Sequence, residues 1–423
     1  MLQSAHAAEA RSLRDLSPAQ WKSGIAAWLG WFFDGLDMHI YTLVAAPFVM
    51  ELVAATSPAA SAVREKSSWI QAAFLVGWAL GGGFFGRAGD LLGRSRALSL
   101  TILTYAVFTG LSFFAHTWWQ LMIFRFVAAL GIGGEWAVGS SLLSETWPKR
   151  WQPWLSGILQ AGVNIGILFA CLAVFLMADL PPRYVFLIGI IPALLVFWIR
   201  RSVPEPEEWL TARNHAQTAT PGVRELFRGD VRRITLMTIA LCSLSLTTWW
   251  AFMFWQAQHL RNLPELASWT TAARERLVSE AFFIFIAVQL LGNAASGALV
   301  KLLGYRGAIA FLLFGLGASM FGAFIVPRGH ESLVFFWFPL VSIFGSVFGL
   351  FTMYMPPLFP TLLRTTGAGF CYNVGRIVAA GGTVFFGLFA NVGNFRLALL
   401  YAAALLVPAS ILALLGPDLP LED

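Results

Sequence analysis

Two aspartates stand three residues apart in a long apolar stretch near the N-terminus. Asp34 and Asp37 lie in the segment WFFDGLDMHIY, and Tyr41 follows on the same face if the segment is helical. Inside a membrane, each ionisable side chain costs about 2.5 kcal/mol or more on insertion scales, so such groups usually face a cavity. Two carboxylates this close cannot easily both stay charged, and one is expected to hold a proton. The pair predicts proton coupling; the alternative is a fixed structural network with a basic residue of another span.

A second pair of ionisable residues lies in a later apolar stretch. Arg125 and Glu135 are ten residues apart, which is about 15 Å along a helix, so they cannot pair with each other. Glu135 is either a second proton carrier or an ion-pair partner. Arg125 needs an internal partner such as Asp34 or Asp37, and a purely structural ion pair remains the alternative.

Arg376 is the best candidate for a substrate anchor. It falls in the middle of the apolar segment CYNVGRI, and the second half of the sequence offers no carboxylate at a similar depth. An unpaired guanidinium there invites an anion, and a carboxylate is its best geometric match. Asn373 and Tyr372 are expected to complete the site. Pairing of Arg376 with Asp34 or Asp37 in the empty state is the rival interpretation.

Two pairs of amides share one spacing. Gln160 and Asn164 are four residues apart, as are Gln289 and Asn293, so each pair shares a helical face. Amides this deep either hold helices together or line a cavity. We include both pairs, together with Tyr41, among the predicted substrate contacts.

The composition defines the elements that must position these groups. Of the 423 residues, 58% are hydrophobic and 12% charged, whereas about a quarter are charged in soluble domains. The apolar runs are long enough to cross a hydrocarbon core of about 30 Å, and each must be helical to satisfy its own backbone hydrogen bonds. We therefore expect an all-α membrane protein with twelve transmembrane helices, near 23–50, 67–88, 95–115, 118–145, 153–178, 183–200, 233–257, 279–301, 306–326, 332–357, 365–391 and 395–416.

Charge and cysteine usage limit the partners. The three cysteines fall inside expected spans without paired spacing, so we expect no disulfide framework, metal site or cofactor. The net charge of +6 comes from basic residues that punctuate the spans, and we expect no nucleic acid partner. With the N-terminus inside, eighteen basic residues lie in inside segments and eight in outside ones, which places both termini in the cytoplasm.

The sequence divides into two halves that look duplicated. We expect an N-terminal tail over 1–22, six-helix halves over 23–200 and 233–416, a cytoplasmic linker over 201–232 and a C-terminal tail over 417–423. The segment GRAGDLLGR from Gly86 has a weaker copy from Gly297, 211 residues later (297 − 86 = 211), and Pro148 is echoed by Pro360 (360 − 148 = 212). Parallel halves of this kind form the architecture in which a central site alternates between the two membrane faces.

The first copy of this segment carries a family resemblance. The chain resembles the major facilitator superfamily over essentially its full length, with Gly86, Asp90, Gly93 and Arg94 in place in the loop signature between the second and third spans. Ser95 stands where a second basic residue is common. The signature is specific for the superfamily but says nothing about the substrate.

The resemblance also implies a conformational role for this loop. In the superfamily, the residues at Asp90 and Arg94 latch the two halves together on the inner side of the membrane. Arg364, at the start of the eleventh span, is the expected counterpart. The second copy has Lys301 where the first has Asp90, so we expect one such latch.

Three features are similar to the sialate, lactate and aromatic-acid proton symporters. They are the Asp-Gly-x-Asp of the first span, the segment from Arg125 to GIGGEW in the fourth, and the SETWPKRW that ends it. In those families, an arginine at the place of Arg125 is tied to proton translocation. The PEPEEWL run after the sixth span is similar to the PESPRWL of sugar porters but lacks its arginine, which argues mildly against a sugar.

The resemblance implies a multi-pass transporter of the cell inner (plasma) membrane and not an enzyme. We expect it to import a small organic carboxylate by proton symport with alternating access, one chain functioning alone as a monomer. The main alternative is efflux of drugs or metabolites by proton antiport, which would suit an aromatic, acid-poor cavity. A membrane-bound transferase would need a His/Asp constellation on an interfacial loop, and a solute sensor would need an attached soluble domain.

Overall fold

The computed structural model describes residues 12–55, 61–177, 180–215, 221–391 and 395–420. Of the predicted tails and linker, residues 1–11, 216–220 and 421–423 lie outside the described residues. All regular structure in the described part of the chain is helical.

The first half begins earlier than expected. Ser17 accepts a hydrogen bond from the amide of Gln20 and Pro18 occupies the first turn, so the first helix starts inside the predicted tail. The helices of this half are α1 (Pro18–Leu52), α2 (Ser61–Leu92), α3 (Arg94–Ser112), α4 (Trp118–Thr146), α5 (Gln152–Leu176) and α6 (Ile191–Ser202), the last continuing a 3-10 segment over Pro182–Ile190.

The second half contains the same number of passes in a more broken form. Its helices are α8 (Val231–Arg261), α9 (Thr271–Phe324), α10 (His330–Ser332), α11 (Phe338–Phe344), α12 (Val347–Tyr354), α13 (Arg364–Asn391), α14 (Phe395–Ala404) and α15 (Leu406–Leu415). A short π-helical segment over Leu333–Trp337 joins α10 to α11, so these pieces and α12 make one pass, as do α14 and α15.

Membrane-length helices dominate the described residues. Eight helical stretches there are long and apolar enough to cross a membrane by length and composition. One of them, Arg276–Phe324, turns at Gly304, where φ is +70°, and so makes two passes. With α1, α3 and α13 the described helices make the twelve expected passes, which confirms the predicted fold class.

The internal repeat is visible in the backbone. Gly93 and Gly304, 211 residues apart (304 − 93 = 211), both have positive φ, at 107° and 70°, where a side chain would be strained. Glu205, after the sixth pass, accepts hydrogen bonds at 3.0 Å from two amides in the first turn of α3. Asp418, after the twelfth pass, accepts one at 3.4 Å from the amide that follows the turn at Gly304 by two residues. Each half therefore uses a carboxylate to cap its third pass.

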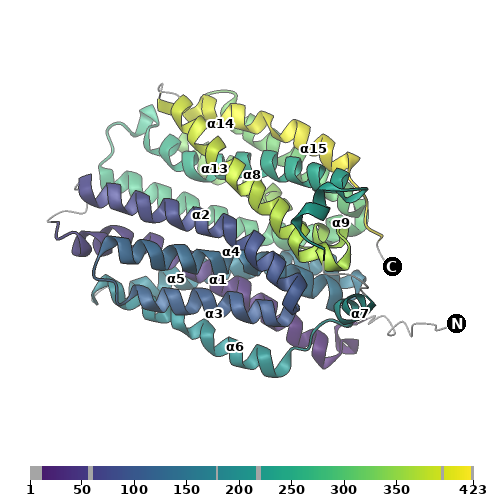
Figure 1. Ribbon diagram of the computed structural model, residues 1–423. Helices are drawn as coiled ribbons and strands as arrows, with labels where there is room; N and C mark the ends of the chain where they lie inside the picture. The colour runs from purple at the N-terminus through teal and green to yellow at the C-terminus, as the bar shows by residue number, and fades with distance from the viewer. Residues whose placement is uncertain (1–11, 56–60, 178–179, 216–220, 392–394, 421–423) are drawn as a thin grey trace.

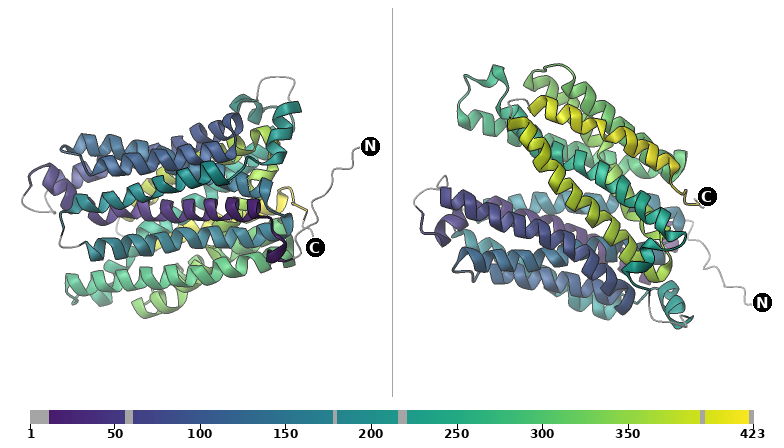
Figure 2. Two further views of the ribbon diagram at one scale, coloured as in Figure 1. Left: turned by 90° about the horizontal axis from the view of Figure 1, so that it is seen from below. Right: turned by 45° about the horizontal axis from the view of Figure 1, so that its top comes forward.

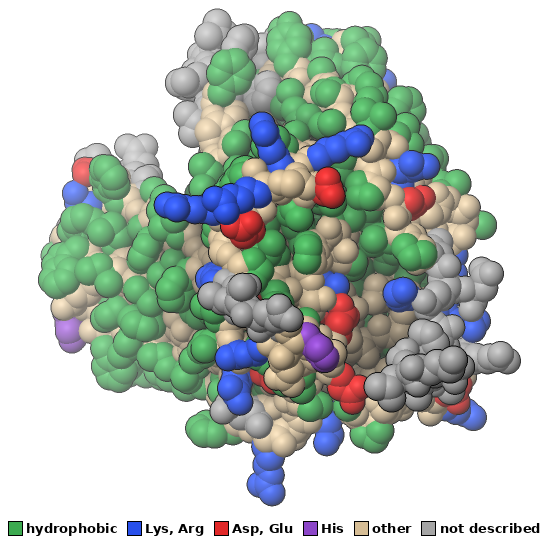
Figure 3. All heavy atoms as spheres, turned by 45° about the vertical axis from the view of Figure 1, so that its right-hand side comes forward, with side chains coloured by type: hydrophobic (Ala, Val, Ile, Leu, Met, Phe, Trp, Pro, Cys, Tyr) green, Lys and Arg blue, Asp and Glu red, His purple; other side chains and the backbone are tan. Residues whose placement is uncertain are grey.

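The two halves meet chiefly along two helix pairs, α2 with α13 and α5 with α9, and α4 and α5 also contact α13 and α12. Figure 1 shows the halves side by side with both described chain ends at one end of the molecule. In Figure 2 they lie close at that end and diverge toward the other. Figure 3 shows the end that carries the termini, where Lys and Arg side chains are scattered among Asp and Glu.

The linker is more ordered than its composition suggested. It contains the helix α7 (Glu207–His215), which the sequence did not predict, and its Trp209 is buried. The indole of Trp209 donates a hydrogen bond at 3.1 Å to the carbonyl oxygen of Asp90 at the end of α2. The linker therefore packs against the ends of the spans on the side of the molecule that carries the termini (Figure 1).

Candidate functional site

The two aspartates of α1 have different surroundings. Asp37 is fully buried and forms an ion pair with Arg125 of α4, with 3.0 Å between its Oδ2 and Nη2 of the arginine. The hydroxyl of Thr109 donates to the other carboxylate oxygen and accepts from Arg125 Nη1 at 3.0 Å. Of the two partners considered for Arg125, the structure selects Asp37. The pair is locally neutral, and its role in proton coupling stays a prediction.

Asp34 faces a second carboxyl group. It lies within reach of Glu135 on α4, and both side chains are buried. Within the described residues, neither oxygen of Glu135 nor Oδ1 of Asp34 meets a hydrogen-bond donor, and no Lys or Arg contacts Glu135. Two buried carboxyl groups in such proximity repel each other when both are charged. Glu135 lacks the ion-pair partner also considered for it among the described residues, and its role as a proton carrier stays a prediction.

Glycine makes this approach possible. A side chain on Gly30, one turn before Asp34, would lie 1.6 Å from Glu135 Oε1, so the glutamate would have to leave its present position. On its other side Glu135 lies near Tyr105 of α3, whose buried hydroxyl is close but outside hydrogen-bonding geometry. The carboxyl pair is thus enclosed by three helices of the first half.

Arg376 of α13 lies at the interface between the halves. Its Nη1 donates to Asn373 Oδ1 at 3.0 Å, and its guanidinium carbon lies 3.8 Å from the ring centroid of Trp78 on α2 and 4.6 Å from that of Tyr372. No acidic side chain among the described residues is in ion-pair contact with it. Its charge nevertheless acts on Asp34 across the interface. The rival interpretation, a direct ion pair with Asp34 or Asp37, is therefore not what this state shows.

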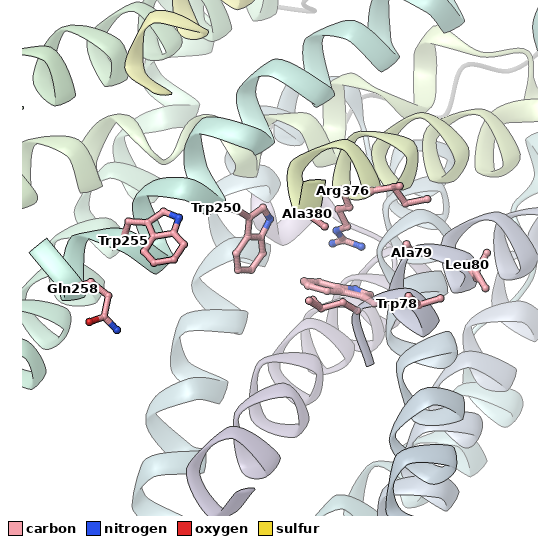
Figure 4. Close-up of a pocket in the computed structure, with 11 residues that line it drawn as sticks. Trp78, Ala79, Leu80, Trp250, Trp255, Gln258, Arg376 and Ala380 are labelled. Atoms are coloured by element: carbon pink, nitrogen blue, oxygen red, sulfur yellow. The ribbon is translucent and has the colours of Figure 1, made fainter. Parts of the chain in front are cut away.

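Arg376 lines a pocket of about 640 Å³ (Figure 4). In Figure 4 its guanidinium lies over the ring of Trp78, with Trp250 beside them and Trp255 and Gln258 farther along α8. The wall consists of one cation, one amide, three indoles and aliphatic side chains: Leu75, Val76, Trp78, Ala79, Leu80, Trp250, Trp255, Gln258, Arg376, Ile377 and Ala380.

The two residues predicted to assist Arg376 have other contacts as well. Asn373 donates from Nδ2 to the carbonyl of Gly369 at 2.7 Å, so both ends of its amide are used and it orients the arginine. Tyr372 stacks on Trp136 of α4, with ring centroids 4.2 Å apart and planes at 11°. This stack joins the two halves directly beside Arg376.

The remaining predicted substrate contacts lie away from this wall. Asn164 donates to Gln289 across the α5–α9 interface at 3.5 Å, and neither side-chain atom of buried Asn293 has a partner among the described residues. Gln160 packs against Gly349, and Tyr41 lies 5.8 Å from the guanidinium of Arg125. Their contact with a substrate stays a prediction.

The predicted latch residues form one network at the end that carries the termini. Asp90 accepts hydrogen bonds from the amides of Thr365 and Thr366, at 3.3 and 2.8 Å, and from the hydroxyl of Thr366 at 2.5 Å. Arg94 pairs with Asp90 at 2.9 Å and donates to the carbonyl of Thr361 at 2.7 Å. Both therefore bind the start of α13 in the second half. Gly86 permits the contact, because a side chain there would lie 2.9 Å from the carbonyl of Thr365.

Arg364 joins this network through two acidic residues. It lies 3.0 Å from Glu145 of α4, which also pairs with Arg94 at 2.7 Å, and 2.9 Å from Glu208 of α7. Burial alone would raise the pKa of Glu208, but the hydrogen bond and charge of Arg364, with the hydroxyl of Thr361, outweigh it and hold that pKa below its usual value. The network ties α4, α7 and α13 together in the present state.

Several of these residues escaped the sequence analysis. Glu145 lies in the quoted SETWPKRW motif, which marked the segment but not its role. Trp78 and Trp136 are two of 18 tryptophans, and no spacing distinguishes them. Tyr105 and Thr109 carry no motif, so only their packing against the carboxylates shows their place.

Comparison with known proteins establishes the family. The profile of the Major Facilitator Superfamily matches residues 27–382, and the chain belongs to this superfamily of transporters, which are not enzymes. A sialic acid transporter of Escherichia coli is 27% identical over 417 residues, covering 96% of each chain. A probable 4-methylmuconolactone transporter of Cupriavidus pinatubonensis is 28% identical over 381 residues, covering 89% of this chain and 85% of the relative.

A solved structure gives the same result for the fold. The proton:xylose symporter XylE matches 95% of this chain and 96% of its own with a TM-score of 0.74, at 15% identity. That likeness shows the fold alone. The chain is a multi-pass membrane transporter, as predicted.

Proposed function

We propose that this protein is a secondary active transporter that imports a small organic carboxylate with protons by alternating access. The observation that carries the proposal is Arg376, a guanidinium on the wall of a pocket between the halves with no acidic side chain in ion-pair contact among the described residues. A carboxylate can accept two parallel hydrogen bonds from such a group. The relatives named for sialic acid and 4-methylmuconolactone support a small metabolite as substrate.

The carboxyl pair of Asp34 and Glu135 supports coupling to protons. Arg376 and Asp34 lie near enough across the interface for their opposite charges to attract each other. A substrate anion on Arg376 would neutralise the charge of the arginine, and the pair would then hold its proton more tightly. Linkage requires the reverse as well, so a bound proton strengthens anion binding. Anion and proton would therefore load together.

The latch network supports the direction of access. It closes the end of the molecule that carries both termini, and the excess of basic residues in the segments at that end supports a cytoplasmic location. The present state is then closed toward the cytoplasm. We propose that rocking of the halves breaks the network and opens the inner side of the plasma membrane to the site.

Proton-driven efflux remains the second candidate, and one observation favours it. The pocket wall is mostly aliphatic and aromatic, which suits an apolar export substrate. Arg376 is the feature that such a substrate would leave unused.

The test is uptake of a panel of radiolabelled carboxylates into proteoliposomes with an alkaline interior, corrected for passive entry with protein-free liposomes. Uptake of one acid that is lost in Arg376→Ala but kept in Arg228→Ala, a change at an exposed surface arginine, supports the proposal. If no acid moves under either direction of the gradient, the carboxylate proposal is wrong and efflux takes its place.

A further inference from the structure

The pocket beside Arg376 differs sharply from a site built for a hydroxylated acid. Apart from the guanidinium, its wall offers the amide of Gln258 and the indole N–H groups, and the other side chains are aliphatic. A ligand bound here meets a charged side chain at Arg376 alone. A ligand with several hydroxyl groups would have more of them than the wall has polar partners, and the remaining hydroxyls would lose water without compensation, which weakens binding.

Aromatic side chains surround Arg376 in this pocket. Trp78 of the first half and Trp250 of the second meet edge to face, with ring centroids 6.0 Å apart and planes at 84°. Arg376 lies over the face of Trp78 at 3.8 Å. The guanidinium is therefore held at an aromatic corner to which each half contributes one indole, as Figure 4 shows.

We propose that the substrate is a planar aromatic monocarboxylate, or a conjugated one of similar shape, with few or no hydroxyl groups. Its carboxylate pairs with Arg376 and its ring packs in the corner of Trp78 and Trp250. This inference rests on the proposed transport of an organic acid and specifies its class. It also accounts for the apolar wall that favours efflux, since the same wall suits the ring of an aromatic acid.

The size of the pocket also favours a substrate with a ring. A volume of about 640 Å³ lies within the range of about 300–1,000 Å³ typical of pockets that enclose drug-sized ligands. A carboxylate with only two or three carbons would leave most of the apolar wall uncovered. A ring uses that wall, and because the wall comes from both halves, its binding draws α2, α8 and α13 together.

The expected discrimination can be given as ratios. Aromatic contacts with suitable geometry add about 0.5–1.5 kcal/mol beyond area burial, which is about 2- to 12-fold. Benzoate should therefore bind about 2- to 12-fold more tightly than cyclohexanecarboxylate, which has the same charge and ring size but no π face. An apolar pocket disfavours even one added hydroxyl by roughly 100-fold, so a tetrahydroxycyclohexanecarboxylate should bind at least that much more weakly.

The experiment is equilibrium binding of radiolabelled benzoate to the purified full-length protein in detergent, with displacement by the other two acids and by lactate. Binding avoids the passive permeation of benzoic acid through lipid. Trp250→Leu should remove the preference for benzoate over its saturated analogue while leaving displacement by both acids measurable. Trp119→Leu, the same change on the exposed surface of α4, should leave the ratio unchanged. Trp78→Leu should lower the affinity for both acids as well, because Arg376 lies on that ring.

Each outcome has a distinct meaning. Benzoate binding that needs Arg376, with the ratios above and their loss in Trp250→Leu, supports the inference. Tighter binding of lactate or the tetrahydroxy acid, still dependent on Arg376, overturns the aromatic class and leaves acid transport standing. A benzoate preference that survives both tryptophan variants overturns the corner as its source. If no acid binds in an Arg376-dependent way, the proposed function itself fails.

Discussion

Removing the Asp90 side chain should open the end of the protein that carries the termini. Asp90 accepts three hydrogen bonds from Thr365 and Thr366 at the start of α13, and these bonds cross from one half to the other. A hydrogen bond to a charged acceptor contributes about 1.5–3 kcal/mol net. Losing the two shorter bonds at the low end of that range destabilises the present latched state by about 3 kcal/mol. Since about 1.4 kcal/mol is tenfold, Asp90→Ala should shift the equilibrium toward a state that is open at this end roughly 100-fold.

The shift can be followed by electron spin resonance distance measurements. Spin labels at Glu65 of α2 and Glu331 of α10, both exposed, report the separation of the halves at the end away from the termini, once exposed Cys171 is replaced by serine. Asp90→Ala should add a population with a shorter distance. Lys301→Ala, at the repeat-equivalent position, removes only a contact of 5.9 Å with the ring of Trp154 and should shift the equilibrium less than about 5-fold. An unchanged distance distribution in Asp90→Ala would refute the latch.

Two further predictions concern other charged contacts. Arg125→Gln should destabilise the protein by about 3–5 kcal/mol, because it leaves Asp37 buried without its cation, and adding Asp37→Asn should recover most of that loss; thermal unfolding in detergent measures both, and additive losses would contradict the pairing. The link between Glu208 and Arg364 depends on pH: because the pKa of Glu208 is lowered in the folded protein, its contribution is complete above the usual glutamate value of about 4.3 and is lost as pH falls through the lowered value. Glu208→Gln should therefore lower the unfolding temperature at pH 7, and this loss should shrink as the pH falls below about 4.3; a loss that stays constant as the pH falls would be evidence against the ion pair.

The sequence was sufficient for the fold because membrane passage constrains each span separately. Apolar run length predicts a pass without knowledge of its neighbours, and the echo of Gly93 at Gly304 reflects a backbone turn that only glycine adopts easily. The linker helix was missed because its stability comes from burial of Trp209 against α2, and local sequence does not show such packing.

The site was predictable in its charges but not in its pairings. Depth in a span marked Asp34, Asp37, Arg125 and Arg376 as ionisable groups that need partners. Which partner each has depends on the packing of α1 against α4 and of α2 against α13, and this requires three dimensions. Trp78 is the clearest example of a residue that the sequence could not identify, since its importance comes entirely from contact with an arginine almost 300 residues away (376 − 78 = 298).

The central claim is that an anion at Arg376 is coupled to a proton held by Asp34 and Glu135. The most direct test compares exchange with accumulation in proteoliposomes, using a radiolabelled acid that the parent protein transports. The double variant Asp34→Asn with Glu135→Gln removes both titratable groups but keeps the sizes of the side chains. It should still exchange internal for external acid while losing accumulation driven by an alkaline interior. Arg376→Ala should lose both. Accumulation by the double variant at the parent level, with a gradient imposed, would contradict the coupling.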